Sequence, residues 1–390
     1  MPIVDLALAD AAERFVAASE VLALDCAAQG PRLRSVLEAG QAALEGGIRP
    51  WTLAYADWEA RIEDLRTLAA DTLFEGDAEG VAMVPSVAFA LATAAHSLPL
   101  GTGDAVLLLE GQFPSNLLPW QQRCAQTGAT IIAARRGPGL DWTEALMQAW
   151  DAAPQVRIVA VPQAHWHDGA LLDIDRIAAR TRERGIALVL DLSQSLGAMP
   201  APLSGWQPDF IASAGHKWLL GPHGLAWLWV APRWREQGDG LDQHWQARAA
   251  GHDWAFPSDA PPPYRRGARR FDAGGVTDPL RLAMSTAALG QLQAWGVENI
   301  SRRLGQLTAA LDSALDSHGL GAWKTPGHAP HFTALRAPDE MQLDHAARAL
   351  RQEGVICTRR AGLLRIAPHL HAGEEHMQRV ARILAGVVQR

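Results

Sequence analysis

The segment from residue 187 to residue 230 constrains the fold more than any other part of the chain. It holds three short apolar runs separated by turn-forming residues, at 187–190, 210–212 and 225–230. Runs of this kind predict buried strands of a parallel sheet. Asp191 ends the first run, and Lys217 follows the end of the second. Ligands of open α/β sheets bind beyond the carboxyl ends of the strands, so we expect these two residues to share a binding site.

The residue types at this edge point to one kind of chemistry. A lysine held among apolar residues loses its proton readily and can form a Schiff base with an aldehyde such as pyridoxal phosphate (PLP). The ring nitrogen of PLP must stay protonated to withdraw electrons, and a buried carboxylate such as Asp191 secures that proton. Gln194 can donate to the ring hydroxyl. The alternative is a structural aspartate beside a surface lysine.

The order of these residues resembles the class V aminotransferase group of fold type I PLP enzymes. That group includes cysteine desulfurases, kynureninases and isopenicillin N epimerase-like proteins. The matching positions are Asp191, Gln194 and Gly197, then His216, Lys217 and Trp218, then Gly221, Pro222 and Gly224. The resemblance extends from about Val21 to Leu384.

The resemblance implies an α/β fold with a mostly parallel seven-stranded sheet between helices and a smaller α+β C-terminal domain. We expect an N-terminal segment, residues 1–33, that packs on the small domain and the active site. The large PLP-binding domain would span residues 34–278, and the small domain residues 279–390. Helical spacing of apolar residues is found at 5–20 and again in one long run at 279–318.

Several residues are candidates for binding the cofactor phosphate. Ser86 and Val87 begin a helix after a strand, and a helix amino terminus offers free N–H groups to phosphate. Without the resemblance, Ser86 would be read only as a helix cap. In similar proteins His216 reaches the phosphate, and a Ser or Thr lies three residues before the lysine. Here that position is Ala214, so Ser213 is a candidate substitute.

The same resemblance implies that two subunits share each site. Gly274, Gly275 and Thr277 match a turn that reaches the phosphate bound by the other subunit. We therefore expect a homodimer in which Gly275 and Thr277 contact the cofactor.

Further residues are candidates for contacts with the ring and the substrate. Phe113, in a Phe-Pro pair, would stack on the ring, and Asn116 would touch the ring hydroxyl or the substrate. Arg365 takes the place of the arginine that binds the α-carboxylate, a task suited to its planar fork. Other candidates for lining the substrate site are Ala28, Gln29 and His165.

Composition excludes several other classes of protein. The net charge of −7 gives no general attraction to nucleic acid or anionic membranes. Three distant cysteines form no disulfide framework, and His165 and His167 lack a third ligand for a metal. The start of the chain has no basic region, and no apolar run reaches the length of a membrane span, so we expect a cytoplasmic protein.

The reaction is less constrained than the cofactor, because PLP supports several reactions. We favour an aminotransferase acting on a small amino acid. A PLP-dependent lyase, breaking a C–S or kynureninase-like C–C bond, and an epimerase stay open. Cys357 lies in an expected strand and not in the mobile loop of a desulfurase, and His216 replaces the usual tyrosine of kynureninases. A non-catalytic PLP-binding module is a further alternative, against which the presence of Lys217, Asp191, Gln194 and Arg365 argues.

Overall fold

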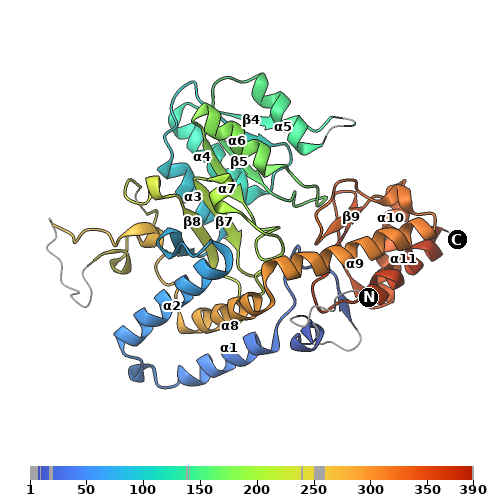
Figure 1. Cartoon of the computed structure of the whole chain (residues 1–390), viewed down its shortest axis with the longest axis horizontal. Helices are drawn as coiled ribbons and strands as arrows, with labels where there is room; N and C mark the ends of the chain where they lie inside the picture. Colours follow the sequence, from blue (N-terminus) through green and yellow to red (C-terminus); the bar gives the residue numbers. More distant parts are fainter. Residues whose placement is uncertain are drawn as a thin grey trace.

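The computed structural model describes residues 8, 10–16, 21–137, 139, 141–238, 240–249 and 260–388. A seven-stranded sheet forms its centre, in the order β2-β8-β7-β6-β5-β3-β4 (Figure 1). The strands are β2 (Val81–Val84), β3 (Ala105–Leu109), β4 (Thr130–Ala134), β5 (Val156–Pro162), β6 (Ala187–Asp191), β7 (Phe210–Ala214) and β8 (Ala226–Val230). This α/β architecture confirms the predicted fold class.

One strand direction differs from the prediction. Strand β8, predicted to be parallel, runs antiparallel to both β7 and β2. A parallel neighbour needs a crossover connection, usually a helix, whereas only residues 215–225 link β7 to β8. This short return places His216 and Lys217 directly beyond the end of β7.

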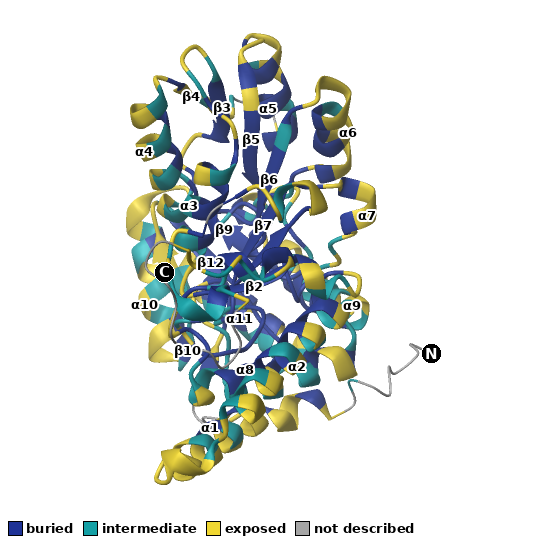
Figure 2. Cartoon of the chain, turned by 90° about the vertical axis from the view of Figure 1, so that its left-hand side faces the viewer, coloured by how far each residue is buried: buried dark blue, intermediate teal, exposed yellow. Residues whose placement is uncertain are grey.

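Helices cover both faces of the sheet, and the strands alternate between two cores. Leu188 and Leu190 of β6 belong to one core, and Val189 between them belongs to the other, as the two-residue period of a strand requires. Helices α2 (Tyr55–Leu73), α5 (Trp142–Asp151), α6 (Ile174–Arg184) and α8 (Pro279–Trp295) supply the first core. The second core is covered by α3 (Val87–Ser97) and α4 (Leu118–Thr127). The sheet is therefore buried on both sides (Figure 2).

The long run predicted at 279–318 is two helices. Helix α8 ends at Trp295, and α9 (Val297–Ser317) begins after Gly296. Gly296 has φ 77° and ψ 129°, a conformation that a glycine adopts without strain and that interrupts the helix. In the predicted helix at 5–20, the described residues include only the short turn η2 (Ala11–Arg14), and residues 5–7, 9 and 17–20 lie outside the described part.

The C-terminal part builds a smaller α+β unit, at the right of Figure 1. Strands β11 (Thr358–Arg360), β12 (Leu363–Ile366) and β9 (Thr333–Leu335) form an antiparallel sheet in that order. Helices α10 (Glu340–Gln352) and α11 (Glu374–Val388) pack against each other there. From the N-terminal segment, β1 (Leu22–Ala23) pairs in parallel with β10 (Val355–Ile356). The division at residues 33 and 278 stays a proposal.

The remaining elements are short, apart from α1 (Arg34–Gly46), which packs along α8. They are α7 (Leu203–Trp206), η3 (Pro50–Thr52), η4 (Ala78–Gly80), η5 (Pro114–Asn116), η6 (Pro232–Trp234), η7 (Trp245–Ala247), η8 (Gly267–Phe271) and η9 (Gly321–Trp323). Among the described helices, none has the length and hydropathy needed to cross a membrane.

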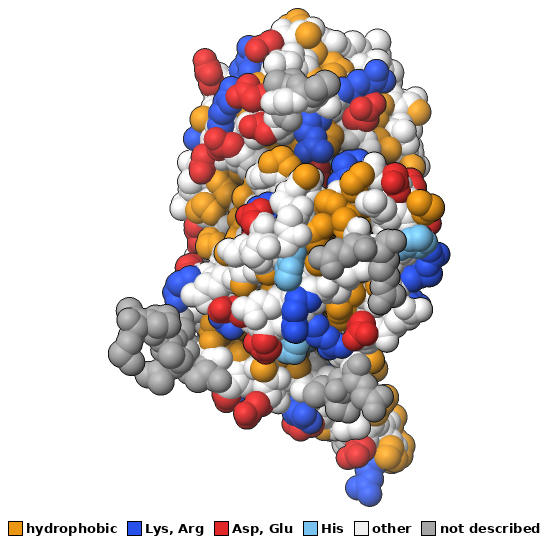
Figure 3. Space-filling model, turned by 90° about the vertical axis from the view of Figure 1, so that its right-hand side faces the viewer, with side chains coloured by type: hydrophobic (Ala, Val, Ile, Leu, Met, Phe, Trp, Pro, Cys, Tyr) orange, Lys and Arg blue, Asp and Glu red, His pale blue; other side chains and the backbone are white. Residues whose placement is uncertain are grey.

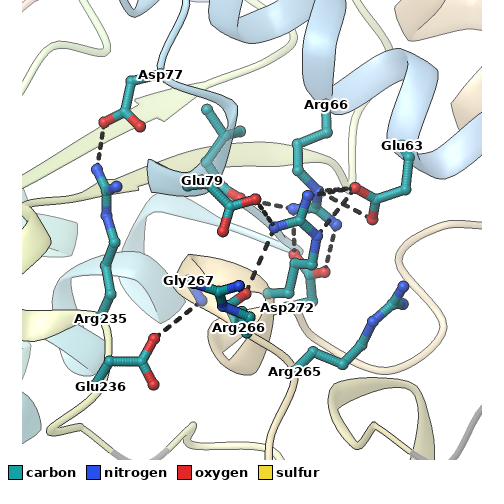
Figure 4. Close-up of polar contacts among 12 residues, drawn as sticks. Glu63, Arg66, Asp77, Glu79, Arg235, Glu236, Arg265, Arg266, Gly267 and Asp272 are labelled. Atoms are coloured by element: carbon teal, nitrogen blue, oxygen red, sulfur yellow. Dashed lines mark hydrogen bonds and ion pairs between the residues drawn. The ribbon is translucent and has the colours of Figure 1, made fainter.

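A buried ion pair covers the outer edge of β2. The guanidinium of Arg66 binds both carboxylate oxygens of Asp272, at 3.2 and 2.7 Å, and also donates to the carbonyl of Val81 (Figure 4). The same carboxylate accepts from the backbone N–H of Met83 at 2.8 Å. Backbone groups at the edge of β2 are thereby satisfied, and the chain leading to residues 273–278 is anchored to the sheet.

We expect Arg66→Ala to lower the free energy of unfolding by about 3–5 kcal/mol, because it leaves the half-buried Asp272 carboxylate without its cation. Urea denaturation of the purified protein measures this change. Arg61→Ala, an exposed change on the same helix, is the matched control and should stay within about 0.5 kcal/mol of the wild type. An equal, small effect of both changes would show that the ion pair contributes little.

Candidate active site

A cavity of about 300 Å³ lies where β2, β6 and β7 end. The carboxyl ends of these strands share one edge of the sheet, as predicted for a ligand site. Seven of the candidate residues line this cavity: Ser86, Val87, Phe113, Asp191, Gln194, His216 and Lys217. Residues from four separate parts of the chain therefore meet in one site.

Lys217 projects its amine into the cavity. Its Nζ lies 5.4 Å from the centre of the Phe113 ring. Burial lowers the pKa of Lys217, Asp191 raises it, and Arg365 lowers it again, with a net decrease. An amine with a lowered pKa is unprotonated more of the time and is therefore a better nucleophile.

Glycines allow the chain to approach this lysine closely. A Cβ atom on Gly30 would lie 2.1 Å from the carbonyl oxygen of Lys217. A Cβ on Gly215 would lie 2.4 Å from the carbonyl oxygen of Leu225. Only glycine fits either position without moving the backbone that carries the amine.

Asp191 is a buried carboxyl at the end of β6. Its Oδ1 accepts from the backbone N–H of Ser193 at 3.1 Å and from the Ser193 hydroxyl at 2.6 Å. Burial raises the pKa of Asp191, although Ser193 and Lys217 act in the opposite direction. Its hydrogen bonds among the described residues come from Ser193 alone and not from a cation, so a protonated group of a ligand would be its natural partner.

The amino terminus of α3 lies at the cavity. Ser86 caps this helix, and its Oγ accepts from the backbone N–H of Phe89 at 3.1 Å. The structural reading of Ser86 as a cap is thus correct, and its place in the cavity lining leaves the phosphate role as a prediction. The rings of His216 and His223 stack nearby, with centres 3.8 Å apart. Burial, His223, Lys217 and Arg32 lower the pKa of His216 to about 4, so it is neutral at pH 7.

Asn116, Ser213 and His165 are among the candidate residues that are absent from the cavity lining. Asn116 is fully buried and its Oδ1 accepts from the Trp120 indole at 3.0 Å. The Ser213 hydroxyl is turned towards the carbonyl of Leu192, at 3.4 Å. The imidazole of His165 contacts the Asp168 carboxylate at 2.8 Å. Each side chain has a hydrogen-bond partner within the protein, and the predicted contacts of these three residues with cofactor or substrate stay predictions.

The residues predicted in the N-terminal segment and the shared turn lie beside the cavity and are absent from its lining. Ala28 and Gln29 are exposed, and their neighbour Ala27 accepts from the Gln194 side chain at 2.8 Å. Thr277 is buried, and its carbonyl accepts from the Trp58 indole at 2.8 Å. Gly275 is exposed. Contacts of Gly275 and Thr277 with a second subunit stay a prediction.

Arg365, on β12, is buried next to the cavity. It donates to the carbonyl of Trp166 at 3.1 Å and pairs with Asp25 at 3.4 Å. Its Nε has no hydrogen-bond partner among the described residues. Burial lowers the pKa of Arg365, which Asp25 partly restores.

Trp166 lines the cavity and was missed by the sequence analysis. Its ring meets Phe113 edge-on at 5.4 Å, its indole donates to the carbonyl of Gly111 at 2.9 Å, and Arg360 lies 4.8 Å from the ring centre. Of the two flanking histidines, His165 contacts Asp168, and His167 contacts the carbonyl oxygens of Arg360 and Ala361. The described residues contain no cluster of potential metal ligands.

Comparisons with known proteins place these features in a family. A family model described as "Aminotransferase class-V" matches residues 23–380. The uncharacterized aminotransferase YcbU of Bacillus subtilis is 30% identical over 311 residues, 78% of each chain. Isopenicillin N epimerase of Streptomyces clavuligerus is 25% identical over 84% of this chain and 83% of its own, and a cysteine desulfurase of Klebsiella pneumoniae is 29% identical over 53% and 52%.

Solved structures show the same fold. The cystine C-S lyase C-DES, in complex with cysteine persulfide, superposes with a TM-score of 0.82 at 20% identity, covering 94% of this chain and 98% of its own. The apo cysteine desulfurase of Thermococcus onnurineus has a TM-score of 0.80 at 17% identity, covering 97% and 98%.

The cavity suits the cofactor of this family. Asp191 offers a buried carboxylate without a cationic partner, and Lys217 offers an amine with a lowered pKa. Phe113 offers a flat ring, and the start of α3 offers backbone N–H groups. These groups match a protonated ring nitrogen, an aldehyde, an aromatic face and a phosphate. The chain belongs to the class V aminotransferase family of fold type I enzymes, which depend on pyridoxal phosphate.

Proposed function

We propose that this enzyme is an aminotransferase in which Lys217 moves the α-proton of a small amino acid. The main support for this proposal is the position of the Lys217 amine. It lies in the cavity near Phe113 and Asp191, and its pKa is lowered. Bound pyridoxal phosphate supplies the electron sink for the charge left at Cα. An unprotonated lysine amine within reach of that carbon is a suitable general base, and its protonated form can return the proton to another atom.

The surrounding residues would orient the cofactor and keep water out. In this proposal Asp191 faces the ring nitrogen, Gln194 the ring hydroxyl, and Phe113 one face of the ring. Ser86 and Val87 present N–H groups to the phosphate. The cavity of about 300 Å³ must hold both cofactor and substrate, which favours an amino acid with a small side chain.

The substrate carboxylate would bind at Arg365. The guanidinium is buried, its Nε has no partner in the described part of the chain, and its ion pair with Asp25 is long at 3.4 Å. A second anion near this group is therefore electrostatically favourable, and the arginine fork suits a carboxylate. Trp166 binds the guanidinium through its carbonyl and lines the cavity with its ring, so it would limit the space for the substrate side chain.

A lyase that breaks a bond at Cβ is the second candidate. Removal of the α-proton by Lys217 would begin that reaction as well, and the relatives at 29% identity include a cysteine desulfurase. The desulfurase route itself, through a protein persulfide, is less supported. Burial raises the pKa of Cys357 to about 12, and Cys26 and Cys124 are buried. A thiol in that state supplies little nucleophilic thiolate.

The homodimer is also a proposal. Helix α1 and the turn after it expose four large apolar side chains, at Leu37, Leu44, Ile48 and Trp51. Apolar groups in such a row are commonly covered by a partner.

Acidic and basic side chains are interspersed on the face seen in Figure 3, which offers nucleic acid no continuous basic surface there.

A visible spectrum recorded during addition of single amino acids tests the reaction. For an aminotransferase, one amino acid should bleach the yellow cofactor band, and a keto acid should restore it. A band that persists while pyruvate, ammonia or sulfide accumulates would contradict transamination and establish the lyase. A band that never changes with any amino acid would contradict both.

Lys217→Ala should abolish covalent attachment of the cofactor. The whole sequence contains only two lysines, Lys217 and Lys324. Borohydride reduction followed by peptide mass spectrometry should find the cofactor on the Lys217 peptide of the wild type and on no peptide of Lys217→Ala. Lys324→Ala is the matched control and should be labelled like the wild type. Label on Lys324, or label retained in Lys217→Ala, would refute the assignment.

Arg365→Ala should raise the KM for an amino-acid substrate about 30- to 1000-fold, equivalent to about 2–4 kcal/mol of lost binding. Steady-state kinetics measure this effect. Arg359→Ala removes a neighbouring arginine that pairs with Glu340 and Asp344, and it should leave KM unchanged. Equal KM values for Arg365→Ala and the wild type would mean that the carboxylate binds elsewhere.

A further inference from the structure

The side-chain amide of Gln194 is held from two sides. Its Oε1 accepts from the indole Nε1–H of Trp218 at 3.0 Å, and its Nε2 donates to the carbonyl of Ala27 at 2.8 Å. Gln194 is nearly fully buried, and what remains exposed of it lines the cavity. The two partners come from distant parts of the chain, namely the residue after Lys217 and the N-terminal segment.

These partners allow only one orientation of the amide. An indole N–H can only donate, and a carbonyl oxygen can only accept. Rotation of the amide by half a turn would set Nε2 against the indole N–H and Oε1 against the Ala27 oxygen. Both contacts would then be repulsive. Because Nε2 carries two hydrogens and Ala27 takes one, the second hydrogen is available to a ligand in the cavity that Gln194 lines.

Trp218 is itself rigidly placed. Its side chain is 1% exposed, and its ring lies 4.4 Å from the His331 ring at an angle of 86°. His331 bonds through Nε2 to the backbone carbonyl of Gln194. Burial lowers the pKa of His331 to about 3, so the ring is neutral and carries its proton on Nε2. The backbone of Gln194 and the indole that binds its side chain are thus packed against the same imidazole.

We propose that Trp218 is a positioning residue that makes Gln194 present an N–H, and not an oxygen, to the ring oxygen of the cofactor. The proposal rests on the contact of Gln194 with that oxygen and is independent of the substrate and of the reaction. A donor facing the ring oxygen stabilises its anionic form. Without the indole N–H, only the Ala27 carbonyl still selects this orientation, and the donor is held less firmly.

Trp218→Phe tests this role, because it keeps an aromatic ring and removes only the N–H and part of the ring area. The readout is the pH midpoint of the visible absorbance of the bound cofactor, measured without substrate. The midpoint should rise by about 0.5–1 pH unit, since loss of a donor to the ring oxygen disfavours the deprotonated form. In Gln194→Leu the midpoint should also rise, and adding Trp218→Phe to it should cause no further change.

The matched control is Trp295→Phe. Trp295 is equally buried, but its indole N–H has no partner among the described residues. This control should leave the midpoint unchanged. A Trp218→Phe protein that binds the cofactor with the wild-type midpoint would overturn the proposal and leave Trp218 a packing residue.

A second measurement covers the case in which Trp218→Phe does not fold. Gln194→Leu removes the acceptor of the Trp218 indole, so one indole proton resonance of the 15N-labelled protein should move upfield. Unchanged indole resonances would overturn the hydrogen bond and the proposal with it. Neither measurement depends on turnover, so a failed aminotransferase assignment would not affect the outcome.

Discussion

The site depends on an amine and a carboxyl group that are buried together. The Lys217 amine and the Asp191 carboxyl lie at the ends of neighbouring parallel strands, β7 and β6, where Asp191 is in register with Ala212. Burial acts on both groups in the same sense, since it disfavours the charged form of each. A cofactor with a protonated nitrogen and an aldehyde relieves both penalties. In the proposed arrangement, Phe113, Gln194 and the start of α3 would hold that cofactor between the two groups.

The N-terminal segment completes this arrangement from outside the central sheet. Asp25 pairs with Arg365, the carbonyl of Ala27 binds Gln194, and the N–H of Gly30 binds the carbonyl of His216. The same segment joins the C-terminal part through the pairing of β1 with β10. A short stretch of chain therefore links the cofactor contacts to the arginine proposed to bind the substrate. The resemblance to the family placed this segment near the active site, but the contacts of Asp25, Ala27 and Gly30 are visible only in three dimensions.

Motif spacing predicted the sheet and the residues that project from strand ends. Asp191, Gln194 and Lys217 follow buried strands directly, so the strand period and the end of the sheet decide where they lie. Asn116, His165 and Ser213 lie in turns or at strand positions where a competing partner decides the direction of the side chain. Trp120, Asp168 and the carbonyl of Leu192 are those partners. The spacing of residues along the chain does not show which partner a polar side chain will bind. For the same reason the sequence did not predict that Trp166, which stands between two histidines, lines the cavity.

The environment of Arg365 bears on how a substrate would be selected. A buried guanidinium needs a counter-charge, and in this conformation Asp25 supplies it at 3.4 Å while Thr358 binds the same carboxylate. A substrate carboxylate would thus join an existing pair and not an isolated cation. Because Asp25 already neutralises part of the charge of Arg365, the free energy gained from binding a substrate carboxylate is smaller than the attraction of an unpaired guanidinium. An amine that carries the same side chain but no α-carboxylate would leave the Arg365–Asp25 pair intact and would gain no binding energy from it. In the proposed binding mode, selection for the carboxylate would depend on the Nε of Arg365, which has no hydrogen-bond partner among the described residues.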